Sequence, residues 1–284
     1  MKTCFITGAN SGIGKQAAIQ IAAKGYHVII GCRSVERGEK ASIEIKKESN
    51  SDAVELVQID MSSKASIMKA VDEIKSKYEV LDVLIHNAAA FDISQKKPIQ
   101  SPDGIECIWA TNHLGPVILT ANLLPLLQKS EQGRVITVAS KGLLMYPKLK
   151  VDLIDPEFKQ RKFSVPKAYY QSKLALIMFT YRLAQKQKGN NITANCIRVT
   201  NVKIDIDRYP NISAFMKWVY KLKSKSAISA DKMARTYTYL ATNQDLSSVT
   251  GKYFTEKNEI VSSSKYSMDK TNIDKVMKLT HKYL

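Results

Sequence analysis

Short apolar runs alternate along the chain with segments whose apolar residues recur at helical spacing. The runs predict buried strands at 2–7, 27–31, 54–59, 81–85, 134–138, 192–198 and 249–254. The segments between them predict helices near 13–24, 35–48, 64–77, 101–129, 168–188 and 231–242. Strands and helices that alternate with short connections form a parallel sheet covered on both faces. The pattern therefore predicts an α/β fold with a doubly wound, mostly parallel seven-stranded sheet.

Two stretches, 141–167 and 200–230, interrupt this alternation. Long excursions at the carboxyl edge of such a sheet usually build a substrate pocket. No linker or shift in composition separates one part of the chain from another, so we expect residues 1–284 to form a single domain.

Composition narrows the class of protein. The chain is 44% hydrophobic and 24% charged, as in ordinary globular proteins. It carries 43 Lys+Arg against 26 Asp+Glu, a net charge of +17, which attracts phosphorylated cofactors, nucleic acid or acidic membranes. We expect no nucleic-acid partner because no recognised binding motif is present. Four widely spaced cysteines, no HExxH motif and no signal peptide or membrane span predict a cytoplasmic protein without a metal.

A glycine-rich turn follows the first predicted strand directly. Strand before and helix after are the context in which such a turn binds the pyrophosphate of a dinucleotide, against backbone N–H groups and a helix N-terminus. A glycine-rich turn without a ligand is the alternative. The residues predicted to contact the cofactor here are Gly8, Asn10, Ser11, Gly12, Ile13 and Gly14.

The end of the second strand bears on the choice of dinucleotide. An acid there would hold a ribose 2′-hydroxyl, whereas an arginine suits a 2′-phosphate. Arg33 and Ser34 stand at this point, so we favour NADP(H) over NAD(H). A solvated surface charge is the alternative for Arg33.

Two further strand ends are predicted to face the cofactor. Asp60 and Met61 follow the third strand, where an adenine would lie, although a simple helix cap is the alternative. Asn87, Ala88 and Ala89 follow the fourth strand, and the two alanines are small enough to let the backbone approach a cofactor.

The pattern Tyr-x-x-x-Lys points to proton transfer, but its spacing alone is weak evidence because it occurs four times. Only Tyr169 and Lys173 open a helix with a long apolar face. At positions i and i+4 the two side chains share one helix face, and a nearby ammonium would lower the pKa of the phenol. For Tyr146/Lys150, Tyr253/Lys257 and Tyr266/Lys270, solvated side chains are the better interpretation.

Two more polar residues complete a candidate catalytic set. Ser140 ends a predicted strand, so its hydroxyl would face the ligand-binding edge of the sheet. Asn112 stands in a predicted helix shortly before Gly115, and its poor helix propensity suggests a packing or functional reason. Either residue alone would more often be structural.

Taken together, TGANSGIG at 7–14, Asp60, HNAA at 86–89, Asn112, Ser140 and YYQSK at 169–173 resemble the short-chain dehydrogenase/reductase family. GCRS at 31–34, TNHLG at 111–115, TGKYF at 250–254 and the long spacing from Ser140 to Tyr169 resemble its retinol-dehydrogenase-like branch. The resemblance spans nearly the whole chain and implies a Rossmann fold.

The resemblance also implies roles for the catalytic set. Tyr169 would be the general acid in carbonyl reduction, or the base in alcohol oxidation. Lys173 would hold the nicotinamide ribose and lower the pKa of Tyr169. Ser140 would hydrogen-bond the substrate oxygen, and Asn112 would hold a water in a proton relay behind Lys173. The implied activity is hydride transfer between NADP(H) and a carbonyl or alcohol, with an apolar aldehyde or ketone as substrate; a non-catalytic NADPH-binding regulator is the alternative.

This sequence departs from the family pattern at three places. Val199-Thr200 replaces a Pro-Gly pair that shapes the nicotinamide pocket, Ala89 replaces a glycine, and Ala139 stands where a second serine is common. None of these changes removes a proton-transfer group.

The segment 215–225 is aromatic and basic. It is a candidate lid over an apolar substrate, with a solvated helix and a weak peripheral membrane contact as alternatives. A small-molecule substrate is the expected partner. The family also makes a homodimer a candidate, although the insert at 141–167 could block it.

Overall fold

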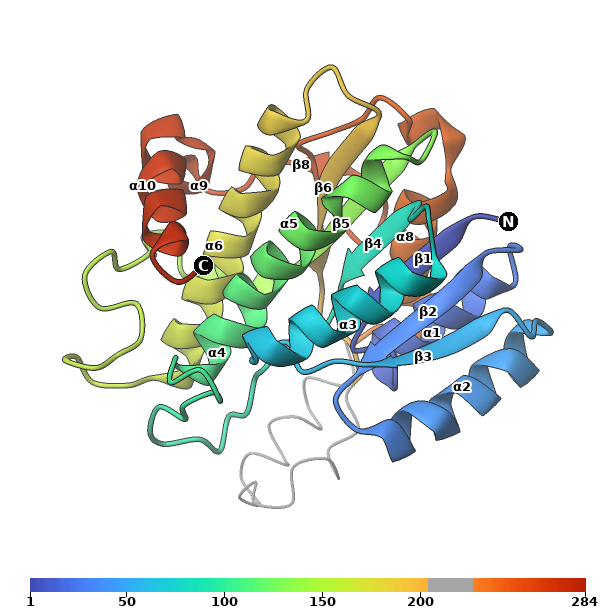
Figure 1. Cartoon of the computed structure of the whole chain (residues 1–284). Coiled ribbons are helices and arrows are strands. Elements are labelled where there is room, and N and C mark those ends of the chain that lie inside the picture. The colour runs from blue at the N-terminus through green and yellow to red at the C-terminus, as the bar shows by residue number, and fades with distance from the viewer. Residues whose placement is uncertain (204–226) are drawn as a thin grey trace.

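The computed structural model describes residues 1–203 and 227–284 of the chain. Its centre is an eight-stranded sheet in the order β3-β2-β1-β4-β5-β6-β7-β8 (Figure 1). The strands are β1 (Thr3–Thr7), β2 (His27–Cys32), β3 (Val54–Gln58), β4 (Val83–His86), β5 (Gly133–Ser140), β6 (Ile192–Val199), β7 (Tyr253–Phe254) and β8 (Ile260–Val261). All neighbouring pairs are parallel except β7 and β8, and the strand order reverses between β1 and β4. The predicted α/β, doubly wound and mostly parallel sheet is confirmed.

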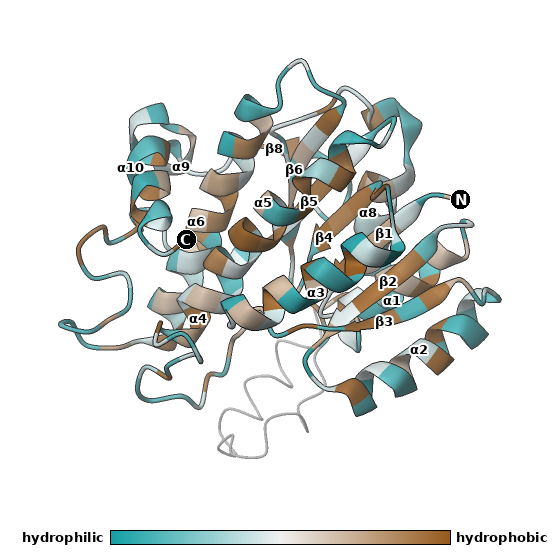
Figure 2. Ribbon diagram, viewed as in Figure 1, coloured by the Kyte–Doolittle hydropathy of each residue, from teal (hydrophilic) through white to brown (hydrophobic). Residues whose placement is uncertain are grey.

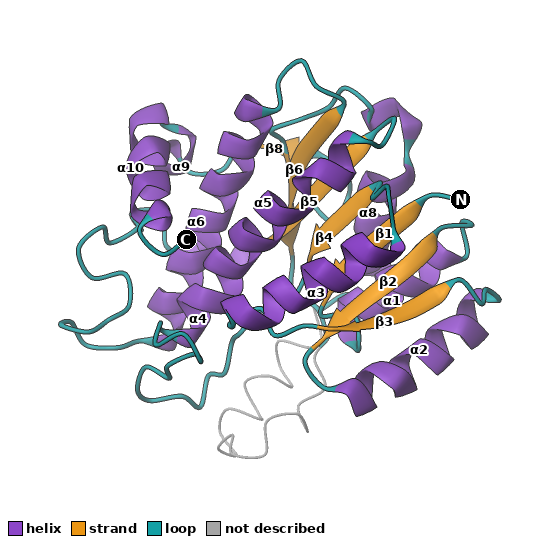
Figure 3. Cartoon of the chain, in the orientation of Figure 1, coloured by secondary structure: helices purple, strands orange, loops and turns teal. Residues whose placement is uncertain are grey.

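Helices cover both faces of this sheet (Figure 3). Helices α3, α5 and α6 pack on the face that carries Phe5, Ile29 and Leu84, while α1, α2 and α8 pack on the other. Because both faces are buried, the strands are apolar over most of their length (Figure 2). The helices are α1 (Gly12–Ala22), α2 (Val35–Ser49), α3 (Lys64–Lys77), α4 (Cys107–Trp109), α5 (Gly115–Gln128), α6 (Val165–Lys186), α8 (Ala230–Thr242), α9 (Lys265–Met268) and α10 (Lys270–His281).

The helix predicted over 101–129 is the largest departure from the expected elements. It begins only at Cys107, where the buried carboxylate of Glu106 accepts hydrogen bonds from the backbone N–H groups of Ile108 (3.0 Å) and Trp109 (2.8 Å). A π-helical segment, Ala110–Leu114, then separates α4 from α5. Segments of this kind occur mostly as local bulges, frequently at functional sites.

Strand β8 and helices α9 and α10, near the C-terminus, were not predicted. Strand β8 is antiparallel and adds an eighth strand to the seven expected, and it is too short to show a period. Helix α9 is also short, whereas α10 packs Ile273, Val276 and Met277 into the core. A 3₁₀ helix, Lys141–Met145, opens the irregular stretch after β5.

The second predicted excursion, 200–230, lies largely outside the described residues, and so does all of 215–225. Its described ends meet in a parallel bridge between Val202 and Ile228. Within the part of the chain that the structure describes, every helix is too short or too polar to cross a membrane.

Candidate active site

Parallel strands bring their carboxyl ends to one edge of the sheet, and the predicted site residues gather there. The glycine-rich turn follows β1, Asn87 follows β4, and Ser140 is the last residue of β5. Helix α6 begins at the same edge and carries Tyr169 and Lys173 in its first turns. The strand order reverses between β1 and β4, and a ligand crevice is expected at such a reversal.

The glycines of the turn allow close backbone packing. Gly8 has a positive φ of 68°, its N–H donates to the Gly31 carbonyl oxygen at 2.7 Å, and a Cβ on it would lie 2.8 Å from the Ala88 Cα. A Cβ on Gly14 would lie 2.4 Å from Nδ2 of Asn87. That amide group donates to the carbonyl oxygens of Thr7 and Gly8, each at 3.0 Å. Asn87 therefore joins the end of β4 to the turn after β1.

The N-terminus of α1 leaves space for an anion. Ser11 is the N-cap residue, but its side chain makes no capping hydrogen bond, and the first turn contains no acidic residue. Gly12 has a φ of 58°, and a Cβ on it would meet nothing within 4 Å. The first N–H groups of a helix lack intrahelical acceptors and carry a partial positive charge. This cradle fits the pyrophosphate of a dinucleotide.

Residues after β2 present cations to solvent. Arg33 and Arg37 are both exposed. Within residues 1–203 and 227–284 neither forms an ion pair. The Ser34 hydroxyl accepts a hydrogen bond from the Arg37 N–H at 3.3 Å, so it caps α2. Cys32, the last strand residue, is not an acid.

Asp60 and Met61 occupy different environments after β3. Oδ1 of Asp60 accepts from the N–H and hydroxyl of Ser62, at 2.9 and 2.7 Å, which orders this turn. The cap of α3 is Ser63 rather than Asp60. The Met61 side chain is buried in the core, and a Cβ on Gly115 would lie 2.3 Å from its carbonyl oxygen. Met61 can therefore offer a nucleotide its backbone but not its side chain.

Tyr169 and Lys173 lie on the face of α6 that is turned to the sheet. The ammonium nitrogen of Lys173 lies 5.7 Å from the centre of the Tyr169 ring and donates to the Val138 carbonyl oxygen at 2.7 Å. Burial lowers the pKa of Lys173 from 10.5 to about 8. The Lys173 ammonium thus lies beside the Tyr169 phenol, near the carboxyl end of β5.

The Ser140 side chain is half-buried at the end of β5. Its Oγ accepts a hydrogen bond from the Gly142 N–H at 3.1 Å, which caps the 3₁₀ helix. The hydroxyl proton remains available to donate to a substrate oxygen.

Asn112 is fully buried in the π-helical segment. Its Oδ1 accepts from the Ala90 N–H at 2.6 Å, and its Nδ2 donates to the Ala90 carbonyl oxygen at 3.0 Å and to the Ser172 hydroxyl at 3.1 Å. That hydroxyl in turn donates to the Tyr169 carbonyl oxygen at 2.7 Å. The Asn112 side chain therefore fastens the loop after β4 to the helix that carries Tyr169.

Several residues around the site were missed by the sequence analysis. The Phe91 ring packs against Tyr169 with 4.6 Å between ring centres. Tyr170 packs against Tyr146 (4.8 Å) and covers Gly142, where a Cβ would lie 2.2 Å from the Tyr170 hydroxyl oxygen. The Tyr237 hydroxyl donates to Oδ1 of Asn87 at 3.2 Å. These contacts join residues far apart in the sequence, so no local pattern announces them.

The side chain of Glu157 forms hydrogen bonds that connect the loops around the candidate site. Its Oε2 accepts from the Glu106 N–H at 3.0 Å, and its Oε1 accepts from the Tyr283 hydroxyl at 3.1 Å. One buried carboxylate thus joins the segment before α4, the stretch after β5 and the C-terminal residues.

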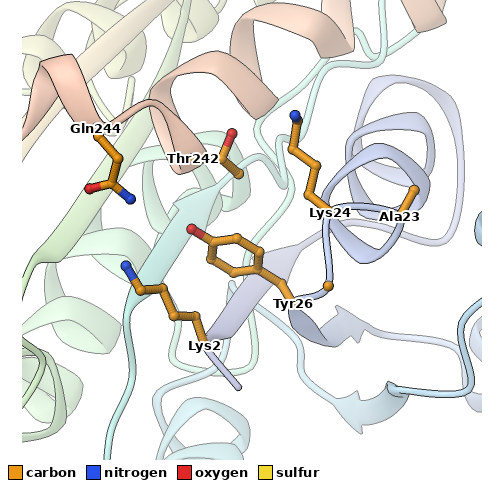
Figure 4. A pocket seen from close by; sticks show the side chains of 7 residues that line it. Lys2, Ala23, Lys24, Tyr26, Thr242 and Gln244 are labelled. Carbon is orange, nitrogen blue, oxygen red and sulfur yellow. The ribbon is translucent and has the colours of Figure 1, made fainter.

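A polar pocket of about 590 Å³ opens at the opposite edge of the sheet (Figure 4). Lys2 and Tyr26, which line it, precede β1 and β2, so the pocket lies at the amino ends of these strands. It is separate from the candidate active site.

Comparison with known proteins shows the family to which the chain belongs. The family model for short chain dehydrogenase matches residues 2–150. The chain belongs to the short-chain dehydrogenase family. It is 33% identical over 259 residues to human (Homo sapiens) retinol dehydrogenase 13, covering 89% of this chain and 76% of that protein. It is likewise 33% identical over 267 residues to human retinol dehydrogenase 14, covering 89% and 77%. These relatives show the retinol-dehydrogenase-like branch of the short-chain dehydrogenases.

Solved structures share the fold. A crystal structure of an uncharacterized protein from Mycobacterium paratuberculosis superposes with a TM-score of 0.76 at 26% identity, covering 100% of this chain and 93% of that one. A short chain dehydrogenase from Shigella flexneri, complexed with NADP, superposes with a TM-score of 0.68 at 22% identity, covering 90% and 97%. The Rossmann fold expected from the sequence is confirmed.

Proposed function

We propose that this short-chain dehydrogenase is an NADP(H)-dependent oxidoreductase that reduces an apolar aldehyde or ketone, and oxidises the alcohol in reverse. The observation that carries the proposal is the pairing of Tyr169 and Lys173 on α6, at the sheet edge where the β1–α1 turn opens. A proton donor beside a dinucleotide cradle is what carbonyl reduction requires.

The cofactor would be held by residues of three strand ends. The backbone from Gly8 to Gly14 fits the pyrophosphate, because α1 begins there with unpartnered N–H groups and no acid. The adenine would be bordered by Asp60 and the backbone of Met61. A ribose of the dinucleotide would be bordered by Asn87, Ala88 and Ala89. When bound, the nicotinamide supplies or accepts the hydride.

The protein's own part in the reaction is proton transfer and orientation. Ser140 would donate a hydrogen bond to the substrate carbonyl oxygen and hold it near the Tyr169 hydroxyl. Tyr169 would then protonate that oxygen as hydride arrives at carbon. Lys173 would favour the phenolate that remains, because a nearby positive charge stabilises the anionic form. Asn112 would position Tyr169 through Ser172 and support the proton relay behind Lys173.

The preference for NADP(H) rests on Arg33. Its guanidinium is exposed after β2, in the place where an acid would select a free ribose hydroxyl. A guanidinium binds phosphate in bidentate fashion, which an aliphatic or acidic side chain cannot do. The Ser34 hydroxyl could add a donor to the same phosphate while still capping α2.

An apolar substrate is favoured by the surroundings of Tyr169. Phe91 covers one side of the phenol ring, and Leu144 and Met145 of the adjoining 3₁₀ helix are exposed. Apolar side chains that stay exposed beside a site are available to an apolar ligand.

The proposal is tested by turnover. Purified protein is incubated with NADPH and a panel of aldehydes and ketones, and the loss of nicotinamide absorbance is followed. Tyr169→Phe should lower kcat by roughly 10²–10⁴-fold, the usual contribution of a general acid, while calorimetry shows that NADPH binding persists. Tyr266→Phe removes the hydroxyl from another Tyr-x-x-x-Lys pair and should turn over like the wild type. No turnover of any panel member, or equal rates for Tyr169→Phe and wild type, would contradict the proposal.

A further inference from the structure

Arg198 lies near the end of β6, on the side of the sheet that α6 covers. In the register of the sheet it is the neighbour of Ala139, one residue before Ser140. Side chains on one strand face recur every second residue, so Arg198 shares its face with Cys196. Cys196 packs with Ile177 of α6, which fixes the direction in which that face points. Arg198 therefore points into the layer that holds Tyr169.

The spacing of helix and strand brings Arg198 to the level of Tyr169. Lys173 and Cys196, on facing sides of the α6–β6 contact, are close enough to shift each other's pKa. Helix α6 runs antiparallel to the strands, because it connects the parallel strands β5 and β6. Four residues back along α6, about 6 Å, lies Tyr169; two residues forward along β6, about 6.6 Å, lies Arg198. The two steps go in the same direction and have nearly the same length.

Tyr253 supplies independent evidence for this neighbourhood. It pairs with Cys196 across β6 and β7. Burial raises the pKa of Tyr253, and among the smaller influences Arg198 lowers it while Tyr169 raises it. The buried phenol of Tyr253 thus lies within electrostatic reach of both side chains.

The guanidinium of Arg198 has no anion to bind in the described parts of the chain. Its Nε is buried without a hydrogen-bond acceptor there, and no carboxylate of these residues forms an ion pair with it. Glu256 follows β7 at the same edge, but its Oε1 lies 3.6 Å from the ammonium of Lys141 instead. A buried donor without an acceptor is unfavourable, so a ligand that supplies the acceptor gains affinity.

We propose that Arg198 binds a carboxylate group of the substrate and thereby selects carbonyl compounds that carry one. The inference rests on the proposed oxidoreductase function and narrows its substrate class: an apolar body against Phe91, a carbonyl at Tyr169 and Ser140, and an acid group at Arg198. A guanidinium and a carboxylate form paired, charge-assisted hydrogen bonds, which give direction as well as affinity. Arg198 is thus a specificity-determining residue.

The test compares substrates that differ only in this charge. 3-Formylbenzoate and 4-formylbenzoate are each paired with their methyl esters, and kcat/KM is measured with saturating NADPH. In the wild type, at least one acid should exceed its ester by tenfold or more. Arg198→Met should reduce that ratio at least tenfold, and Arg198→Lys should reduce it less. Arg235→Met removes an exposed arginine on α8 and should leave the ratio unchanged.

Other outcomes separate this proposal from the proposed function. Turnover of the esters with no preference for either acid, or the same ratio in wild type and Arg198→Met, overturns the role of Arg198 alone. A loss of NADPH affinity that matches the kinetic loss, with the ratio intact, assigns Arg198 to the cofactor and also overturns it. No turnover of acid, ester or any member of the aldehyde and ketone panel overturns the oxidoreductase function. In that case the role of Arg198 is tested by calorimetry with benzoate in the presence of NADPH. Benzoate binding to the wild type that Arg198→Met abolishes supports the carboxylate site, and absence of benzoate binding to the wild type refutes it. If Arg198→Met does not fold, Arg198→Gln takes its place.

Discussion

The ammonium nitrogen of Lys173 lies 2.7 Å from the carbonyl oxygen of Val138, in the interior of the protein. Val138 belongs to β5, the strand that ends in Ser140, so one hydrogen bond fixes the lysine relative to the hydroxyl that would hold the substrate oxygen. A backbone acceptor does not titrate. The charge of Lys173 is therefore set by its burial rather than by a carboxylate partner.

This burial predicts a specific dependence of stability on pH. Burial lowers the pKa of Lys173 to about 8, whereas the unfolded chain keeps a value near 10.4. Between these values the unfolded state binds more protons than the folded state, so the free energy of unfolding rises with pH. Urea unfolding should show that the free energy of unfolding of the wild type rises relative to that of Lys173→Met between about pH 8 and 10. The rise should be at most about 3 kcal/mol. Lys270→Met, which removes the exposed lysine of another Tyr-x-x-x-Lys pair, should leave the wild-type slope unchanged; a flat difference for Lys173→Met would contradict the prediction.

Activity should change in the opposite direction over the same range. The charged form of Lys173 would hold the ribose and favour phenolate, and it is lost as pH rises through about 8. The kcat/KM for NADPH, which reports ionisation of the free enzyme, should therefore fall above about pH 8. A profile that stays level to pH 10 would mean that the ammonium does not contribute.

Two glycines in the first turn of α1 should respond differently to a methyl group. Gly14→Ala places a Cβ 2.4 Å from Nδ2 of Asn87 and 2.6 Å from the Gly8 carbonyl oxygen, so it should lower the free energy of unfolding by roughly 1–3 kcal/mol. Gly12→Ala meets no atom within 4 Å and bears only the cost of its positive φ, about 1–2 kcal/mol. Its methyl group would enter the space assigned to the pyrophosphate. Denaturant unfolding and NADPH calorimetry should show weakened binding in Gly12→Ala beyond its loss of stability. Undiminished NADPH affinity in that variant would contradict the cradle.

Arg33 should distinguish the two nicotinamide cofactors. Arg33→Ala removes a charge-assisted contact worth about 1.5–3 kcal/mol, so the Kd of NADPH should rise roughly 10–100-fold. The Kd of NADH should change little, because NADH lacks the 2′-phosphate. Lys40→Ala on α2, where the lysine pairs with Glu36, is the control. An equal loss for both cofactors would show that Arg33 acts on their shared parts.

Much of the fold could be predicted because its signals are local. Buried parallel strands are continuous apolar runs, and both bounds of each strand from β1 to β6 were predicted within two residues. The exceptions have physical reasons. Strand β8 is too short to show a period, and the π-helical segment Ala110–Leu114 contains Asn112, whose hydrogen bond with Ala90 no local pattern reveals. The apolar spacing of α10 was present in the sequence and was missed.

The residues of the candidate site also divide into those that a local sequence pattern reveals and those that only the fold reveals. Residues that carry a motif, such as Tyr169 and the glycine turn, could be found because their chemistry depends on short spacing. Ser34 was expected to face a phosphate. It also caps α2, a role that a serine directly before a helix commonly has. Phe91 and Arg198 could not be identified, because their relation to Tyr169 exists only after the chain has folded.

The anchoring of three segments by Glu157 limits where the surroundings of the candidate active site can be changed. Both oxygens of the Glu157 side chain accept hydrogen bonds, Oε2 from the Glu106 N–H and Oε1 from the Tyr283 hydroxyl and the Lys159 ammonium. Moving the stretch that carries Glu157 would leave both the Glu106 N–H and the Tyr283 hydroxyl without this acceptor. A mutant library that seeks new substrates should therefore vary residues away from these anchors, such as 92–100 and 143–150, and leave Glu157 unchanged.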